Sequence, residues 1–303
     1  MTVHRELRTI PLAFAIAATL LLAASAQEPS GNAVIRGKAG SSEIIVTTTA
    51  RVAGAIHSLT WNGKEFLDSH DHGRQMQSAV NLDCGKDFIP EVFNPTEAGS
   101  SLDGEGVNSS SKLLRSSATD SELRTTTLMA FWLAPGEKSL GNAARNGKAL
   151  SDHRVSKRVR IGYKDMPHAI EYEVTFNIPE GERHTYAQFE ALTGYMPPEF
   201  SRFWKFERDS GELRPLDDGP GEQEAPVVFA TPSGSHAMGV YSPDHPQGYG
   251  RFRFKDEKVN KWNCVFRVRE PKGIKPGNYS YRLFVTVGTL EDVRRTLKRL
   301  NDS

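Results

Sequence analysis

Cysteine is nearly absent from the 303 residues of this chain. The two that occur, Cys84 and Cys264, lack the spacing of a zinc-binding motif, so no cysteine-based metal site is expected. In an oxidising compartment they could form one long-range disulfide. Two free buried thiols are the alternative, because a core of this size needs no covalent crosslink.

An excess of charge of either sign is also absent. Lysine and arginine number 38, aspartate and glutamate number 37, and the two signs are interspersed along the chain. Such a balance does not favour nucleic acid or an anionic membrane surface, and we expect neither as a partner.

Long apolar runs are lacking beyond the N-terminus. The one run, residues 12–23, follows two arginines and precedes Ala24-Ser25-Ala26, a small-x-small pattern typical of a signal-peptide cleavage site. We expect residues 1–26 to be a signal peptide and the mature protein to be periplasmic or secreted, with no membrane partner after cleavage. An uncleaved membrane anchor is the alternative, which is disfavoured because the run is short for a stable span.

Helical periodicity is scarce. Only residues 290–300 have a convincing helical pattern, with Thr289 as a cap and acidic residues in the first turn, as the helix dipole favours. The other elements read as short strands between turns such as Asn62-Gly63. They cover residues 42–49, 52–61, 124–133, 155–163, 169–178, 185–193, 227–231, 236–241, 251–255, 262–268 and 279–287. Regular spacing without intervening helices predicts an all-β fold. We expect one large antiparallel β-sandwich domain over residues 27–303, with one C-terminal helix.

A short polar run after the Asn62-Gly63 hairpin is rich in chemically active groups. It holds two imidazoles, a carboxylate, a guanidinium and two amides, from His70, Asp71, His72, Arg74, Gln75 and Gln77. On an extended chain His70 and His72 point to one side and could bind a metal. They could equally cap loop carbonyls, and a single histidine is more often structural than catalytic. We therefore predict a sugar-facing loop, with no metal and no cofactor.

Three further segments carry groups suited to a saccharide, which needs aromatic faces for its C–H surfaces and planar polar groups for its hydroxyls. They supply Asn94 and Glu97; Tyr195, Glu199 and Trp204; and Tyr241, Asp244 and His245. The first two belong to an irregular stretch, residues 87–111, whose phenylalanines and prolines favour an ordered wall over a cleft. Trp132 lies in an almost continuously apolar run and is predicted to be in the core.

The N-terminal hairpin resembles a known family. Its Gly54-Ala55, Ser58-Leu59 and Asn62-Gly63 pairs, followed by Gly73-Arg74, are similar to the opening of galactose-mutarotase-like (aldose-1-epimerase-like) proteins. The resemblance implies a supersandwich of antiparallel strands, with Arg74 at the edge of a sugar cleft. The family's mid-chain catalytic histidine and C-terminal glutamate have no counterpart in the expected setting, so the resemblance implies the fold more than the epimerase reaction.

The polar groups leave several reaction types open. A polysaccharide lyase would use Arg74 or Asn94 against a uronate carboxylate, with a histidine as base and a tyrosine as acid. A glycoside hydrolase needs two carboxylates across a cleft. The pool for that pair is Asp71, Glu91, Glu97, Glu190, Glu199 and Asp244.

We predict an exported carbohydrate-binding protein that is a carbohydrate-active enzyme, namely a sugar epimerase, polysaccharide lyase or glycoside hydrolase. The alternatives are a non-catalytic glycan-binding module and, third, a structural β-sandwich. The predicted catalytic residues are His70, His72, Arg74, Tyr195 and Glu199. The predicted substrate-binding residues are Asp71, Gln75, Gln77, Asn94, Glu97, Trp204, Tyr241, Asp244 and His245.

Overall fold

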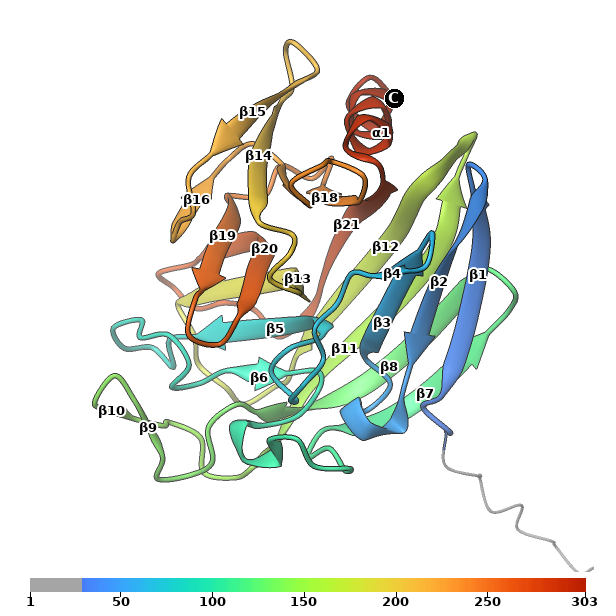
Figure 1. Cartoon of the computed structure of the whole chain (residues 1–303). Helices are drawn as coiled ribbons and strands as arrows, with labels where there is room; N and C mark the ends of the chain where they lie inside the picture. The colour runs from blue at the N-terminus through green and yellow to red at the C-terminus, as the bar shows by residue number, and fades with distance from the viewer. Residues whose placement is uncertain (1–28) are drawn as a thin grey trace, which may run out of the picture.

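Residues 29–303 are described by a computed structural model of the chain (Figure 1). The predicted signal peptide, residues 1–26, lies outside the described residues. From residue 29 onward, no helix is both long and apolar enough to cross a membrane.

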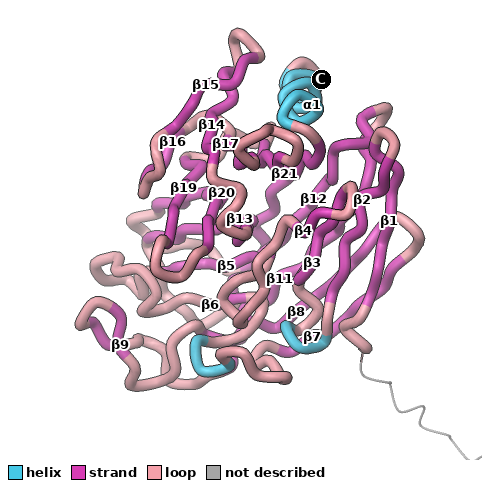
Figure 2. The backbone as a smooth tube through the Cα atoms, viewed as in Figure 1, coloured by secondary structure: helices cyan, strands magenta, loops and turns pink. Residues whose placement is uncertain are grey.

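Two runs of antiparallel strands build the molecule, as Figures 1 and 2 show. The first run consists, in order of pairing, of β7 (Lys112–Ala118), β8 (Glu122–Phe131), β11 (Leu150–Tyr163), β12 (Met166–Ile178), β21 (Gly277–Gly288), β18 (Ala237–Tyr241), β17 (Val227–Ala230), β14 (Arg202–Glu207) and β15 (Glu212–Leu216). The second consists of β1 (Ala33–Ala39), β2 (Ser42–Thr48), β3 (Ile56–Trp61), β5 (Met76–Leu82), β13 (Tyr186–Met196), β20 (Val259–Arg269), β19 (Gly248–Phe254) and β16 (Gly221–Gln223).

Short elements complete the fold. β4 (Lys64–Glu65) pairs with β3, and β6 (Pro95–Thr96) pairs with both β5 and β8, so it links the two runs. β9 (Lys138–Ser139) and β10 (Asn142–Ala143) form a separate two-stranded sheet. The helical elements are two 3-10 turns, η1 (Ala50–Val52) and η2 (Ser101–Asp103), and the helix α1 (Leu290–Asn301).

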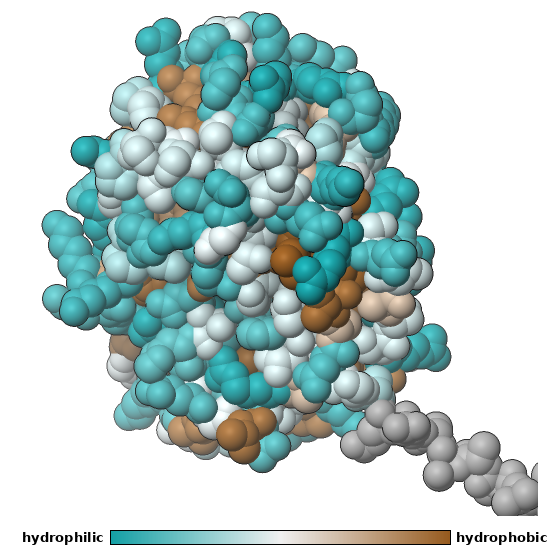
Figure 3. Space-filling view, turned by 45° about the vertical axis from the view of Figure 1, so that its right-hand side comes forward, coloured by the Kyte–Doolittle hydropathy of each residue, from teal (hydrophilic) through white to brown (hydrophobic). Residues whose placement is uncertain are grey.

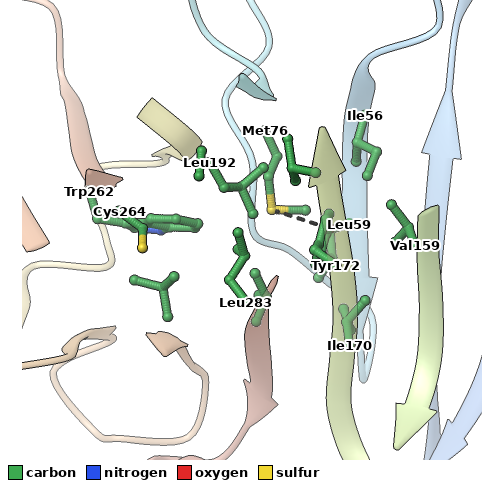
Figure 4. Packing of buried hydrophobic residues seen from close by; sticks show 14 of the residues in the cluster. Ile56, Leu59, Met76, Val159, Ile170, Tyr172, Leu192, Trp262, Cys264 and Leu283 are labelled. Carbon is green, nitrogen blue, oxygen red and sulfur yellow. Dashed lines mark hydrogen bonds between the residues drawn. The ribbon is translucent and has the colours of Figure 1, made fainter. Parts of the chain in front are cut away.

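The core lies between the two runs of strands. β11 alternates buried and more exposed residues along most of its length, which is the period expected of a strand with one face on a core. In the close view of Figure 4, Met76 and Leu192 from the second run meet Tyr172 and Leu283 from the first. The Tyr172 hydroxyl donates to the Met76 sulfur at 3.7 Å, so this polar tip is satisfied inside the core. Figure 3 shows that hydrophilic residues dominate one outer face, with apolar colour confined to small patches.

The predicted fold class is confirmed: the described chain is an antiparallel β-sandwich with one α-helix, at its C-terminal end. The helix follows the predicted capping pattern. Thr289 accepts a hydrogen bond from the Asp292 backbone at 3.1 Å, and the Asp292 carboxylate accepts from the Thr289 backbone at 3.2 Å. Val293, Leu297 and Leu300 bury the inner face of the helix.

Two local predictions were wrong. The strand expected from residue 52 begins only at Ile56, because Ala53 and Gly54 adopt φ values of 53° and 78° and turn the chain there. The polar run predicted as one loop ends at Met76, where β5 begins. Every residue of β5 is buried, so both of its faces are covered. One face meets the core, and the other forms part of the floor of a cleft.

Candidate functional site

A pocket of about 260 Å³ opens on the polar face of β5, β13 and β20. Its floor comes from these three strands, and its walls come from the loop before β5, from the segment containing β6 and from Trp132. The charged residues that line it are Asp71, Arg74, Glu91, Glu190, Glu257 and Lys261. Segments far apart in the chain, from Asp71 near its start to Lys261 near its end, therefore meet in one concave surface.

A β-bulge in β13 arranges the floor. The register with both neighbouring strands shifts between Glu190 and the residues that follow it. Because side chains alternate between faces, one extra residue reverses the parity of every position beyond it. Gln188 and Glu190 before the bulge, and Thr193 and Tyr195 after it, therefore all line the pocket.

A carboxylate, an ammonium and a phenol meet on this floor. The Glu190 carboxylate lies 3.3 Å from Lys261 Nζ, with side-chain exposures of 13% and 16%. Lys261 Nζ also lies 5.4 Å from the centre of the Tyr195 ring. Burial disfavours the charged form of Lys261, but Glu190 and Tyr195 raise the pKa of its ammonium above the usual value. Burial raises the pKa of the Tyr195 phenol, with Lys261 opposing it, so the phenol stays protonated at neutral pH.

Arg74 is held at the rim by acidic partners. Its guanidinium lies 3.1 Å from Asp71 and 3.0 Å from Glu257, and it is 15% exposed. Asp71 also accepts a hydrogen bond from the Gly73 backbone at 2.8 Å. The pocket lining thus has four carboxylates against two cations, and its arginine is already paired.

Trp132 and Asn94 form the wall. Trp132, predicted to be in the core, is only partly buried and lines the pocket. A Cβ at Gly73 would lie 3.0 Å from the Trp132 ring, so only glycine lets the indole lie this close to the loop. The Asn94 side chain is 8% exposed, and its Oδ1 has no hydrogen-bond partner within the described protein. An unpaired buried acceptor in a pocket wall is suited to a ligand hydroxyl.

Five of the predicted site residues line this pocket. They are Asp71, Arg74, Gln77, Asn94 and Tyr195. The amide of Gln77 is engaged by backbone groups: it donates to the Gly73 carbonyl at 3.0 Å and accepts from the Ala98 amide at 3.0 Å. Gln77 therefore braces the loop and the wall against each other.

Three more predicted residues are buried and do not line the pocket. The two ring nitrogens of His72 contact the Gly104 and Arg51 carbonyl oxygens at 2.8 and 2.7 Å, so neither is free for proton transfer to a ligand. Gln75 is fully buried and donates to the Asp71 carbonyl. Glu97 is fully buried in an ion pair with Lys157. All three positions are corrected from ligand-facing to structural.

The remaining predicted residues lie away from the pocket. His70 is exposed and pairs with Glu105 at 2.9 Å, and Glu199 pairs with Lys64 on the surface. Trp204 packs against the cluster under α1. Tyr241 is buried there too, with the Arg208 guanidinium 4.7 Å from its ring centre.

Asp244 and His245 belong to an exposed turn beyond β18, where Asp244 accepts a hydrogen bond from the Arg282 backbone at 2.6 Å. A larger depression of about 800 Å³ lies beside His245. None of these predicted residues, His70 and Glu199 included, lines the pocket over β5, β13 and β20.

Several pocket residues were missed or unassigned by the sequence. Lys261, Glu257, Asn81, Gln188 and Trp132 were not predicted, and Glu190 was only one of six candidate carboxylates. The alternation of Gln188 and Glu190 was a usable signal for one face of β13. Nothing local to the sequence pairs Lys261 with Glu190, since β13 and β20 lie far apart in the chain.

Both cysteines are free thiols. Cys264 is buried in the core and Cys84 is partly buried near the surface. Of the two alternatives left open by the sequence, the structure has the unbridged one.

No family model matches the chain, and no curated protein is similar to it in sequence. Among solved structures it is similar to a protein from Escherichia coli K12 provisionally described as an aldose 1-epimerase, at 11% identity and a TM-score of 0.48, covering 86% of this chain and all of that one. A galactose mutarotase related enzyme from Lactobacillus acidophilus is similar at 9% identity and a TM-score of 0.45, covering 86% of this chain and 98% of that one.

An α-galactosidase from Geobacillus stearothermophilus is similar at 9% identity and a TM-score of 0.44, with 87% of this chain and 42% of that chain covered. All three similarities concern the arrangement of strands alone.

Proposed function

We propose that the chain is a carbohydrate-active enzyme that binds a neutral saccharide in the pocket over β5, β13 and β20 and acts on it by general acid–base chemistry. The observation that carries the proposal is the Glu190–Lys261 pair on the pocket floor, with both side chains less than one fifth exposed. Removing two charges from water is costly, and a hydrophobic pair would hold two strands together as well or better. A desolvated charge pair facing a pocket is therefore a sign of a functional site.

The three floor groups can divide the work of a proton relay. Glu190 is suited to accept a proton from a sugar hydroxyl or from water. Tyr195, kept protonated by burial, is suited to donate one to a ring oxygen or a leaving oxygen. Lys261 contacts both and holds them in place. Asp71, anchored by Arg74 at the rim, supplies a second carboxylate to the same pocket.

The charge balance favours a neutral sugar over a uronate. A lyase needs a free cation to neutralise the uronate carboxylate. Arg74 is paired with Asp71 and Glu257, and Lys261 is paired with Glu190, while the four carboxylates of the lining repel an anion. An epimerase or glycosidase reaction fits this lining better than a lyase reaction does.

A saccharide screen followed by one substitution tests the proposal. Saturation-transfer NMR against neutral mono- and oligosaccharides identifies a ligand, and the same spectra follow anomeric interconversion or release of a reducing end. Glu190→Gln should retain binding and lose about 10²–10⁴-fold in turnover, the usual contribution of a general base. Glu199→Gln is the matched control, since its carboxylate pairs with Lys64 outside the pocket. Equal turnover in both variants would overturn the proposal.

Trp132 supports a second candidate, a non-catalytic glycan-binding protein. Its partly exposed indole and the unpaired Asn94 oxygen could hold a sugar without any proton transfer. If binding alone is the function, Trp132→Ala abolishes binding, while no saccharide in the screen is converted by the unmodified chain.

Export belongs to the same proposal. The apolar run over residues 12–23 and the Ala24-Ser25-Ala26 pattern support removal of residues 1–26 during secretion. N-terminal sequencing of the chain recovered from its native host tests this. A start near Gln27 is expected, and a retained Met1 would contradict it.

A further inference from the structure

Two histidines and a glutamate converge at a second place in the molecule. His153 of β11 and His184, two residues before β13, each direct Nε2 at the same oxygen of Glu182, at 2.7 and 2.8 Å. Their three potential ligand atoms lie within 4.8 Å of one another. None of the three residues lines the pocket of the proposed enzyme, so that function does not account for them.

The cluster is shielded from water on one side. The imidazoles of His153 and His184 are 1% and 2% exposed, whereas Glu182 is 23% exposed. The Phe93 ring packs against both imidazoles, with centroid distances of 6.1 and 5.3 Å. Glu182 lies in the connection between β12 and β13, so its side of the cluster is the open one.

The donor atoms of the cluster point to one class of metal. Two imidazole nitrogens beside one carboxylate are a donor set that zinc prefers, whereas magnesium and calcium prefer oxygen alone.

We propose that His153, Glu182 and His184 bind a Zn²⁺ ion. Tetrahedral coordination places neighbouring donor atoms about 3.3 Å apart. The two contacts to Glu182 must therefore lengthen by about half an ångström on binding. Glu182, a partly exposed residue in a connecting segment, can make that movement. Three protein ligands leave a coordination position for water.

Asp83 is the positioning residue for this site. The Cys84 backbone N–H donates to His184 Nδ1 at 3.2 Å, so without metal the ring carries its proton on Nε2. Zinc takes the electron pair of Nε2, which releases that proton to water. A second proton from water then occupies Nδ1, and the Cys84 N–H that donates to Nδ1 without metal must turn away. The Asp83 carboxylate, 3.9 Å from Nδ1 and 2% exposed, is placed to accept the resulting N–H. The exchange leaves the ring neutral.

Zinc titration of the full chain after treatment with a chelator tests the inference. Calorimetry should give one zinc per chain and a raised melting temperature, with no response to Mg²⁺ or Ca²⁺. His153→Gln and Glu182→Gln, which preserve side-chain volume, should each weaken zinc binding by about 100-fold or more, and Asp83→Asn by about 10–100-fold. The fold of each variant is verified from its circular dichroism without metal.

Two controls separate this site from surface histidines and thiols. His70→Ala removes an exposed imidazole beside Glu105, and Cys84→Ser removes the neighbouring thiol; both should leave zinc affinity unchanged. The inference is overturned if no stoichiometric zinc binds. It is equally overturned if binding survives His153→Gln and Glu182→Gln, or disappears only with Cys84→Ser. Saccharide turnover enters none of these measurements, so this result and that for the proposed enzyme are independent.

Discussion

Two lysine–glutamate pairs in this molecule use the same chemistry for different purposes. Lys157 and Glu97 are 1% and 0% exposed, 2.5 Å apart, and the Ser78 backbone adds a hydrogen bond to Glu97 at 2.9 Å. Lys261 and Glu190 are 16% and 13% exposed, 3.3 Å apart, and face a pocket. The first pair is enclosed by protein on all sides and joins the segment of β6 to β11. The second leaves part of its hydrogen-bonding capacity to a ligand, so geometry around the charges, more than the charges themselves, separates structure from function.

The largest effect is expected from breaking the buried Lys157–Glu97 pair. Lys157→Met leaves the Glu97 carboxylate buried without a counter-ion, and this should cost about 3–5 kcal/mol of unfolding free energy. Urea denaturation measures the loss. Lys261→Met is the matched control and should cost clearly less, since Glu190 lines the pocket and can turn toward water. Equal destabilisation by the two substitutions would remove the distinction between the pairs.

Shortening the Glu190 side chain tests the same comparison through turnover. Glu190→Asp keeps the charge but withdraws the carboxylate by about one bond length, and displacement on that scale should lower turnover about 100-fold. The melting temperature should stay nearly constant, because the substitution keeps a carboxylate beside Lys261. Parallel assays of turnover and thermal unfolding measure both. Turnover close to that of the unmodified chain would count against Glu190 as the base.

A third carboxylate, Glu182, extends the comparison to pH. Its pKa is lowered to about 2 in the folded chain from the usual value of 4.5, because the hydrogen bonds from the two histidines outweigh burial. A depressed pKa means that the folded state favours the ionised form. The resulting stability is present above pH 4.5 and is lost as pH falls from there toward 2. Urea midpoints across this range should fall less steeply for Glu182→Gln. Parallel curves for the two proteins would contradict the assignment.

The smallest effect concerns the thiols. Burial raises the pKa of Cys84 to about 12 and also raises that of Cys264, so neither is a thiolate at neutral pH. Iodoacetamide should modify the native chain slowly and both cysteines rapidly in denaturant, as read by mass spectrometry. If neither cysteine is modified in denaturant without reductant, the two form a disulfide and the prediction is wrong.

The sequence predicted what depends on local pattern. Alternating strands such as β11 and β12, and the helix after Thr289, follow from side-chain period and capping, which act within a few residues. The polar run near Arg74 and the wall at Asn94 were also recognised, because polar groups in turns and long ordered loops are unusual. β5 was missed as a strand, since Ser78 on its apolar face and Ala79 on its polar face interrupt the alternation.

The pocket was predicted less well for a physical reason. Proposed catalytic histidines were assigned from their chemistry, but His72 is enclosed by carbonyl oxygens and His70 lies on the surface. Trp132 was assigned to the core from its apolar neighbours. Its side chain instead reaches the pocket beside Gly73, a contact that depends on where two distant loops meet.

By itself, the sequence determined an antiparallel sandwich, a capped terminal helix and a set of polar side chains without their partners. The tertiary structure alone decided that the β13 bulge turns Glu190 and Tyr195 to one face, and that Lys261 lies opposite them. The physical reason is the separation along the chain over which each interaction acts. Propensity and periodicity act over neighbouring residues, whereas charge pairing and pocket shape depend on strand register between segments far apart in the chain.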